Sequence, residues 1–203
     1  AALLPGLPLS ALAANSLLRR RIGSSNEWLP VIGLGTSRTH DVALDKASLD
    51  PLLKVLRTLV NGGASLIDTA PSYGASEAVT GELLKRTKTQ GKAFLATKVW
   101  TRGRTEGIHQ MEESLRRLQV ERLDLMQIHN LVDWQTQLAT LRDWKGAGRV
   151  RYLGVTHYTA GAYDALETVM RTEALEFVQI NYSLDERDAE RRILPLAAER
   201  GMA

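Results

Sequence analysis

One unit of the fold is contained in residues 123–156, LDLMQIHNLVDWQTQLATLRDWKGAGRVRYLGVT. A short apolar run is followed by a stretch in which Leu138 and Leu141 share one helix face, and then by a second apolar run at residues 150–156. Short apolar runs are typical of buried parallel strands, and a spacing of three or four residues is typical of helices. Gly146 and Gly148 lie where the helix should end. The segment therefore predicts a strand, a helix and a second strand.

The same unit recurs along the chain. Apolar runs occur at residues 31–35, 65–68, 93–98, 123–129, 150–156 and 177–182. Their centres lie roughly 30 residues apart, which is the size of one strand–helix unit, and strict alternation predicts a parallel sheet covered by helices. Asp50 and Pro51 are predicted to start the first helix, and Gly62 to end it. Residues 17–30 are predicted to form a small hairpin with its turn at residues 23–26.

Two α/β architectures fit this alternation, an open doubly wound sheet and a closed (β/α)₈ TIM barrel. The doubly wound dinucleotide fold should carry G-x-G-x-x-G after its first strand. Here Gly33 and Gly35 are followed by Arg38 in place of the third glycine, which favours the barrel. A complete barrel has eight units and about 250 residues. We therefore expect about six βα units after the hairpin, in a fragment that ends before strands seven and eight.

Composition excludes several classes of protein. The chain has 203 residues, of which 44% are hydrophobic and 24% are charged, so it is not disordered. It has no cysteine and therefore no disulfide scaffold. The net charge of +3 is not concentrated in one block apart from residues 19–21, which argues against nucleic acid as a partner. The four histidines show no metal-ligand spacing, so we expect no metal site.

The first 14 residues, AALLPGLPLSALAA, are uncharged and apolar. They are too few for a membrane-spanning helix, which needs about 20 apolar residues. Their length and the Ala-x-Ala pattern are typical of a signal peptide. We predict a signal-peptide remnant at residues 1–14 and an incomplete barrel domain at residues 15–203. The protein would then be exported, through the twin-arginine route, with a cytoplasmic location as the alternative. The sequence does not indicate an oligomeric state.

Polar side chains follow the ends of three successive apolar runs. They are Asp68, Lys98 and His129, and Tyr73 lies five residues after Asp68. The carboxyl ends of barrel strands converge on one mouth. There, Lys98 would stabilise the Tyr73 phenolate and Asp68 would keep the lysine charged. Such a set is a proton donor for a carbonyl oxygen, and because no side chain donates a hydride, it implies a nicotinamide cofactor.

The chain resembles the aldo-keto reductases over residues 17–203. The resemblance is carried by six motifs at residues 33–36, 67–74, 96–99, 114–118, 123–129 and 148–155. It implies a (β/α)₈ barrel and the reduction of a small aldehyde or ketone by NADP(H), with NAD(H) as the alternative cofactor. It also implies a catalytic tetrad with a tyrosine as the general acid, here Asp68, Tyr73, Lys98 and His129.

The resemblance also indicates where the cofactor would bind. The residues assigned to it are Gly35, Thr36, Asp68, Thr156, His157 and Gln179. The family usually has Ser-Asn where this chain has Thr156 and His157, so an imidazole replaces a carboxamide. Trp100 and Asn130 lie just beyond strand ends and are assigned to the substrate pocket.

Two other functions remain open at this stage. Lys98 could form a Schiff base in an aldolase, because a lysine at the end of a barrel strand can be a nucleophile. A neighbouring Asp68 argues against this, since it would keep the amine protonated. The second alternative is a protein that binds a nucleotide on the same scaffold without catalysis, as a sensor.

Overall fold

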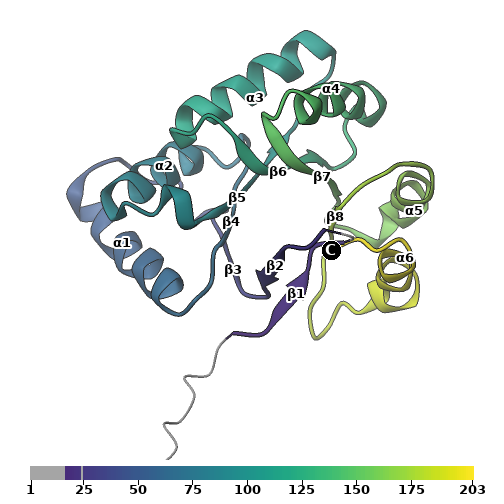
Figure 1. The fold of residues 1–203 in the computed structure, drawn as a ribbon, viewed down its shortest axis with the longest axis horizontal. Helices are drawn as coiled ribbons and strands as arrows, with labels where there is room; N and C mark the ends of the chain where they lie inside the picture. Colours follow the sequence, from purple (N-terminus) through teal and green to yellow (C-terminus); the bar gives the residue numbers. More distant parts are fainter. Residues whose placement is uncertain (1–16, 24) are drawn as a thin grey trace, which may run out of the picture.

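The computed structural model describes residues 17–23 and 25–203, and the predicted signal-peptide remnant lies outside this range. Six parallel strands form one sheet in the order of the chain. They are β3 (Gly33–Gly35), β4 (Leu66–Asp68), β5 (Phe94–Val99), β6 (Leu123–His129), β7 (Val150–Thr156) and β8 (Phe177–Gln179). Figure 1 shows these strands following one another around an arc. The fold is therefore α/β, and the curled sheet is consistent with part of a (β/α)₈ barrel.

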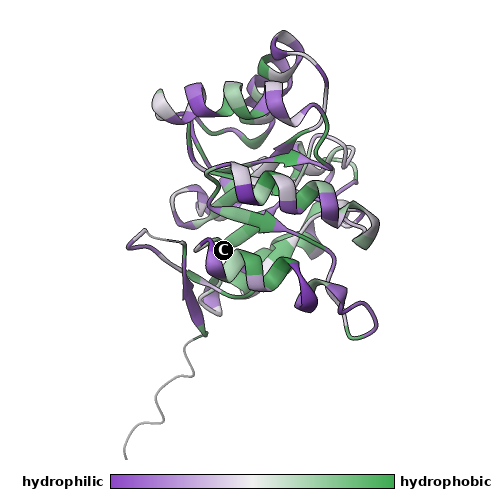
Figure 2. Cartoon of the chain, turned by 90° about the vertical axis from the view of Figure 1, so that its right-hand side faces the viewer, coloured by the Kyte–Doolittle hydropathy of each residue, from purple (hydrophilic) through white to green (hydrophobic). Residues whose placement is uncertain are grey.

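Six helices lie on the outer side of this arc (Figure 1). They are α1 (Lys46–Asn61), α2 (Ser76–Thr87), α3 (Arg104–Leu118), α4 (Trp134–Gly146), α5 (Tyr163–Thr172) and α6 (Ile193–Glu199), with short 3₁₀ turns at η1 (Gln90–Lys92), η2 (Ala160–Ala162) and η3 (Asp188–Arg191). Figure 2 shows that the sheet is mostly hydrophobic while the helices carry hydrophilic residues between apolar ones. The main core lies between the two layers, as the alternating pattern predicts. In the described part of the chain, no helix combines the length and apolar character needed to cross a bilayer.

The register of the strands brings their carboxyl ends to one level. Asp68 pairs with Ala96, two residues before Lys98, and Lys98 itself pairs with Gln127. His129 pairs with Thr156, which in turn pairs with Gln179. The polar residues that end separate strands in the sequence therefore meet at one edge of the sheet.

The predicted hairpin is confirmed at the opposite end of the strands. β1 (Arg19–Arg21) and β2 (Trp28–Pro30) pair antiparallel. Arg151 links the hairpin to the sheet, because its guanidinium donates to Glu27 in the hairpin and to Asp124 Oδ1 at 2.6 Å. The Tyr152 hydroxyl also donates to Glu27 Oε2 at 2.8 Å. The hairpin thus covers the amino ends of β5, β6 and β7.

The start of α1 differs from the sequence prediction. The helix begins at Lys46, five residues before Pro51, and Asp45 is its N-cap, with Oδ1 accepting from Ser48 N at 2.8 Å. An Asp side chain at the N-cap satisfies an otherwise unpaired backbone N–H, and Pro51 lies inside the helix, where it leaves one helical bond unmade. The predicted end at Gly62 is confirmed, since this residue is the C-cap.

Helices α2 and α3 approach each other most closely at Gly81. A Cβ at this position would lie 2.3 Å from Arg117 O and 3.0 Å from Leu118 Cα, both of which are backbone atoms. We expect Gly81→Ala to lower the free energy of unfolding by about 1–3 kcal/mol, because the helices must move apart. Gly146→Ala is the matched control, since a Cβ there meets nothing within 4 Å. Its stability should be unchanged or raised by up to about 1 kcal/mol. Urea denaturation of both variants measures this, and equal effects would contradict the close approach.

Candidate active site

The centre of the site is a buried ion pair between β4 and β5. The Lys98 side chain is 1% exposed, and its Nζ donates to both carboxylate oxygens of Asp68 at 2.8 Å and to Thr69 O at 2.8 Å. An ammonium group has three protons, and these three acceptors match them. Burial lowers the pKa of Lys98, while the charges of Asp68 and Glu77 oppose that shift. The ammonium is therefore fixed in direction by the ends of two neighbouring strands.

Two glutamine side chains complete the surroundings of Asp68. Gln127 Nε2 lies 3.4 Å from Asp68 Oδ1 and 3.2 Å from Gln179 Oε1. Gln179 Nε2 in turn donates to Asp68 Oδ2 at 3.2 Å. Gln127 was not among the residues assigned to the site from the sequence. It is one of two polar residues, with Asp124, inside the apolar run that ends at His129, and it lies nearer the carboxyl end of that run, which is the signal that could have identified it.

Tyr73 lies above the ion pair, half-buried. The Lys98 Nζ is 5.0 Å from the centre of its ring, and the His129 ring meets it edge-on at 6.0 Å. Burial raises the pKa of Tyr73, and the Asp68 carboxylate raises it further. That Lys98 stabilises the Tyr73 phenolate stays a prediction from the sequence. Tyr73 rests as a neutral phenol with its proton in place.

The loop that carries Tyr73 is held by the loop that follows β3. Asp41 Oδ1 accepts from Ala75 N at 2.9 Å, and Gly74 adopts a φ of +60° directly against this carboxylate. Thr36, next to Gly35, is fully buried, and its hydroxyl donates to Asp68 O at 3.0 Å. Thr36 thus contacts the backbone of the ion-pair strand, and its side chain fixes the position of Asp68.

His129 ends β6 beside Tyr73 and is half-buried. Its Nδ1 lies 3.4 Å from Ser72 Oγ, and its ring centre is 5.8 Å from that of Trp100. Burial lowers the pKa of His129 to about 4, helped by the charge of Lys98 and by His157. The imidazole is therefore neutral near pH 7 and carries one N–H that can donate a hydrogen bond.

Thr156 and His157 lie on the neighbouring strand end. Thr156 is buried at the end of β7. His157 Nδ1 accepts from Tyr158 N at 3.0 Å and from Thr159 N at 3.3 Å, and the imidazole stacks on the Tyr158 ring. Because Nδ1 is an acceptor, the proton of the neutral ring is on Nε2. The imidazole therefore fixes its own loop through one nitrogen and presents a donor through the other.

The two residues assigned to the substrate pocket lie beside His129. Trp100 follows β5, is 46% exposed, and packs its ring near that of His129. Asn130 has a φ of +53°, and its Oδ1 is buried without a hydrogen-bond partner. A buried amide oxygen without a partner is an available acceptor. Within residues 17–23 and 25–203, no three His, Asp or Glu side chains form a cluster that could hold a metal ion.

The ion pair generates a prediction about stability. Asp68→Asn leaves the buried Lys98 ammonium without its counter-charge and should lower the free energy of unfolding by about 3 kcal/mol. Adding Lys98→Met removes the uncompensated charge, so the double variant should be more stable than Asp68→Asn alone. Urea denaturation of the two single variants and the double variant measures the coupling. Additive losses would show that the two groups do not depend on each other.

The environment of His129 generates a prediction about pH. Its pKa of about 4 lies below the usual 6.5, so the folded protein binds fewer protons than the unfolded chain between these values. The free energy of unfolding should therefore fall as the pH is lowered from 6.5 to 4. Titration of the His129 ring by NMR should give a midpoint near 4, and Lys98→Met should raise it by removing the repulsion. A midpoint near 6.5 in the parent protein would contradict this environment.

Comparisons with known proteins indicate one protein family. The model of the aldo/keto reductase family matches residues 31–203. The aldo-keto reductase YhdN of Bacillus subtilis (strain 168) is 29% identical over 183 residues, covering 83% of this chain and 54% of that protein. The methylglyoxal reductase YeaE of Escherichia coli (strain K12) is 30% identical over 185 residues, covering 88% of this chain and 63% of that protein.

A solved structure indicates the same protein family. The crystal structure of an aldo/keto reductase from Klebsiella pneumoniae, in complex with NADP and acetate, matches with a TM-score of 0.74 and 26% identity. The match covers 86% of this chain and 62% of that one. The chain thus spans less than two thirds of the length of each of these three relatives. The chain belongs to the aldo/keto reductase family.

Proposed function

We propose that this site reduces an aldehyde or ketone to an alcohol, with Tyr73 as the general acid and a nicotinamide cofactor as the reductant. The observation that supports this most directly is the placement of a neutral, protonated Tyr73 over the fixed Asp68–Lys98 pair. A methylglyoxal reductase among the similar proteins agrees with a small carbonyl compound as substrate.

The proton transfer follows from the charges around Tyr73. When a carbonyl carbon is reduced, its oxygen gains negative charge and takes up the phenolic proton. The phenolate left on Tyr73 then faces the Lys98 ammonium, 5.0 Å from the ring centre. The lysine charge therefore acts on the product of the transfer, where it lowers the energy of the phenolate. Asp68 keeps the ammonium charged and correctly directed throughout.

His129 orients the carbonyl group in this proposal. As a neutral imidazole it can donate one N–H to the carbonyl oxygen without adding a second positive charge beside Lys98. Trp100 lies against the His129 ring and would form one wall of the substrate pocket. Asn130, which follows His129, would line the same pocket.

The donor set fits a nicotinamide carboxamide. That group has one oxygen acceptor and an NH₂ donor. The Nε2–H of His157 would donate to the oxygen, and Gln179 offers an amide oxygen for the NH₂. Thr156, Gly35 and Thr36 would also be among the residues that hold the cofactor, and Thr36 contacts the backbone of Asp68. When bound, the cofactor supplies the hydride, and NADP(H) is the first candidate because the Klebsiella pneumoniae relative was solved with NADP, with NAD(H) as the alternative.

The alternative as a Schiff-base aldolase is disfavoured by the bonds of Lys98. All three protons of its ammonium have acceptors around the buried pair, so forming a nucleophilic amine would require these hydrogen bonds to break.

The signal-peptide remnant at residues 1–14, the barrel domain at 15–203 and export of the protein stay predictions from the sequence.

The role of Tyr73 is tested by Tyr73→Phe. Oxidation of NADPH with methylglyoxal or 4-nitrobenzaldehyde should fall by about 100-fold or more in kcat, since a positioned general acid contributes at least that factor. Binding of NADPH, measured by fluorescence, should be retained because the aromatic ring is kept. Tyr152→Phe removes a hydroxyl at the opposite end of the strands and should leave kcat unchanged. Full turnover by Tyr73→Phe would exclude it as the acid, while NADPH binding without turnover by the parent protein would favour the sensor.

A further inference from the structure

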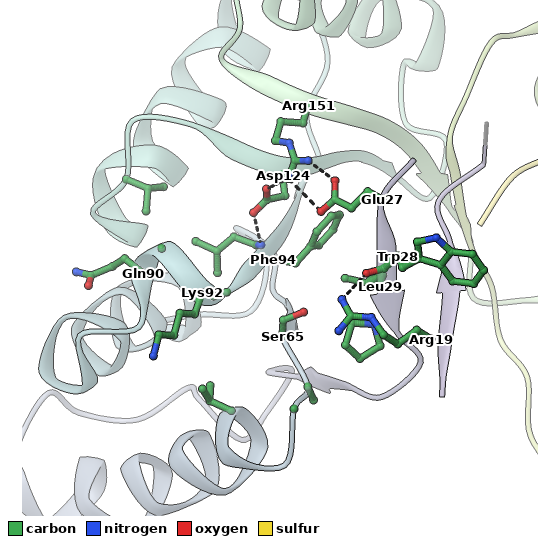
Figure 3. A pocket seen from close by; sticks show the side chains of 18 of the residues that line it. Arg19, Glu27, Trp28, Leu29, Ser65, Gln90, Lys92, Phe94, Asp124 and Arg151 are labelled. Atoms are coloured by element: carbon green, nitrogen blue, oxygen red, sulfur yellow. Dashed lines mark hydrogen bonds and ion pairs between the residues drawn. The ribbon is translucent and has the colours of Figure 1, made fainter. Parts of the chain in front are cut away.

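A cavity lies at the end of the strands opposite the candidate active site. It has a volume of about 690 Å³ and lies between the hairpin strand β2 and the segments that lead into β4, β5 and β6 (Figure 3). Sites for small molecules are typically clefts of about 300–1,000 Å³. This amino-end hollow is therefore large enough for a small ligand, and none of the residues assigned to the reductase site lines it.

The acidic groups of the amino-end hollow are already engaged. Glu27 and Asp124 both pair with Arg151, and Figure 3 shows the three side chains turned toward one another. Asp124 Oδ2 also accepts from Leu95 N at 2.8 Å. The negative charge on these two side chains is therefore directed to one guanidinium and one backbone amide.

The other cationic side chains of the amino-end hollow are not paired with acidic side chains in this way. Arg19, Lys92 and Arg122 line it, and among the described residues no acidic side chain pairs with any of the three. Within the described part of the chain, Arg19 donates from Nη2 to a neutral acceptor, Trp28 O, at 2.6 Å. Figure 3 shows Arg19 and Lys92 on opposite sides of the hollow. Counting Arg151, the lining has four cationic side chains against two acidic ones, so it carries a net positive charge.

We propose that the amino-end hollow binds a small phosphate-bearing anion. Arginine guanidiniums form paired hydrogen bonds with phosphate oxygens, and a lysine ammonium adds a compact charge. Cations on opposite sides of a cavity match an anion whose oxygens point in several directions, as those of a phosphoryl group do. The Ser65 hydroxyl offers a further polar contact in the lining, and the partly apolar wall at Leu29 and Phe94 leaves room for an organic substituent.

Binding in this position has a structural consequence. Arg19 belongs to the hairpin, Lys92 to the turn before β5, and Arg122 to the segment before β6. An anion held by all three would connect the hairpin to the sheet at a second place, in addition to the Arg151 link. The hairpin should then be protected from local opening when the anion is bound.

Inorganic pyrophosphate is the probe for this site. Isothermal titration of the full chain should show saturable binding that weakens as KCl is raised, because the contacts are ionic. Lys92→Gln/Arg122→Gln should weaken this binding at least tenfold. Lys54→Gln/Arg57→Gln is the matched control, since it removes the same charge from exposed positions on α1 and should bind like the parent. Hydrogen exchange should report protection of residues 19–21 and 28–30 by pyrophosphate in the parent and the control only.

A second titration with phenyl phosphate distinguishes the two sources of a phosphoryl group. Tighter binding of phenyl phosphate than of inorganic phosphate indicates an organic phosphate, and equal binding indicates an inorganic anion; both support the site if Lys92→Gln/Arg122→Gln weakens them. The proposal is overturned if pyrophosphate does not saturate, or if the Lys92 and Arg122 variant binds as the parent does. Equal losses in both double variants would also overturn it, since they would indicate attraction by net charge alone. None of these readouts depends on reductase activity.

Discussion

The structure depends on one electrostatic constraint, the charge of Lys98 in a buried position. An ammonium removed from water costs several kcal/mol unless acceptors replace the lost hydration. Here the chain at the end of β4 supplies the acceptors, which are the Asp68 carboxylate and Thr69 O. Only a parallel register that sets Asp68 opposite Ala96 brings this carboxylate next to Lys98. The Asp68–Lys98 ion pair therefore depends on the register of the strands, and it places both charges at the carboxyl ends, where the candidate active site lies.

Much of this arrangement could be predicted from the sequence because it follows from local patterns. The runs at residues 123–129 and 150–156 coincide with β6 and β7, since apolar side chains and their polar end residues are local features. The start of α1 was misplaced because Asp50-Pro51 was taken as the start signal, although Asp45 and Ser48 form an equally local cap three residues apart. Gln127 and the raised pKa of Tyr73 depend on which strands become neighbours, which no single stretch of sequence encodes.

The two ends of the sheet differ in how fully their charged side chains are paired. At the carboxyl end, the described contacts of Lys98 are complete, and both Asp68 oxygens have additional amide neighbours. At the amino end, Glu27 and Asp124 share Arg151, and among the described residues three other lining cations have no acidic partner. A network in which every polar group has a hydrogen-bond partner favours a rigid site. Its protons have fixed positions, because each group orients its neighbour. Uncompensated cations around a cavity favour the uptake of an external anion instead.

The raised pKa of Tyr73 is consistent with the role proposed for it. A general acid must hold its proton until the acceptor becomes basic, and burial beside Asp68 keeps the phenol protonated at rest. A resting phenolate would have no proton to give. In the proposed reaction, Lys98 would act on Tyr73 after the transfer, when a new negative charge appears near its ammonium. His129, neutral because it is buried beside the same lysine, adds a donor without repelling Lys98. Burial, helped by the charge of Lys98, thus lowers the pKa of His129 and keeps it neutral, and in the proposed reaction the same lysine charge would stabilise the Tyr73 phenolate.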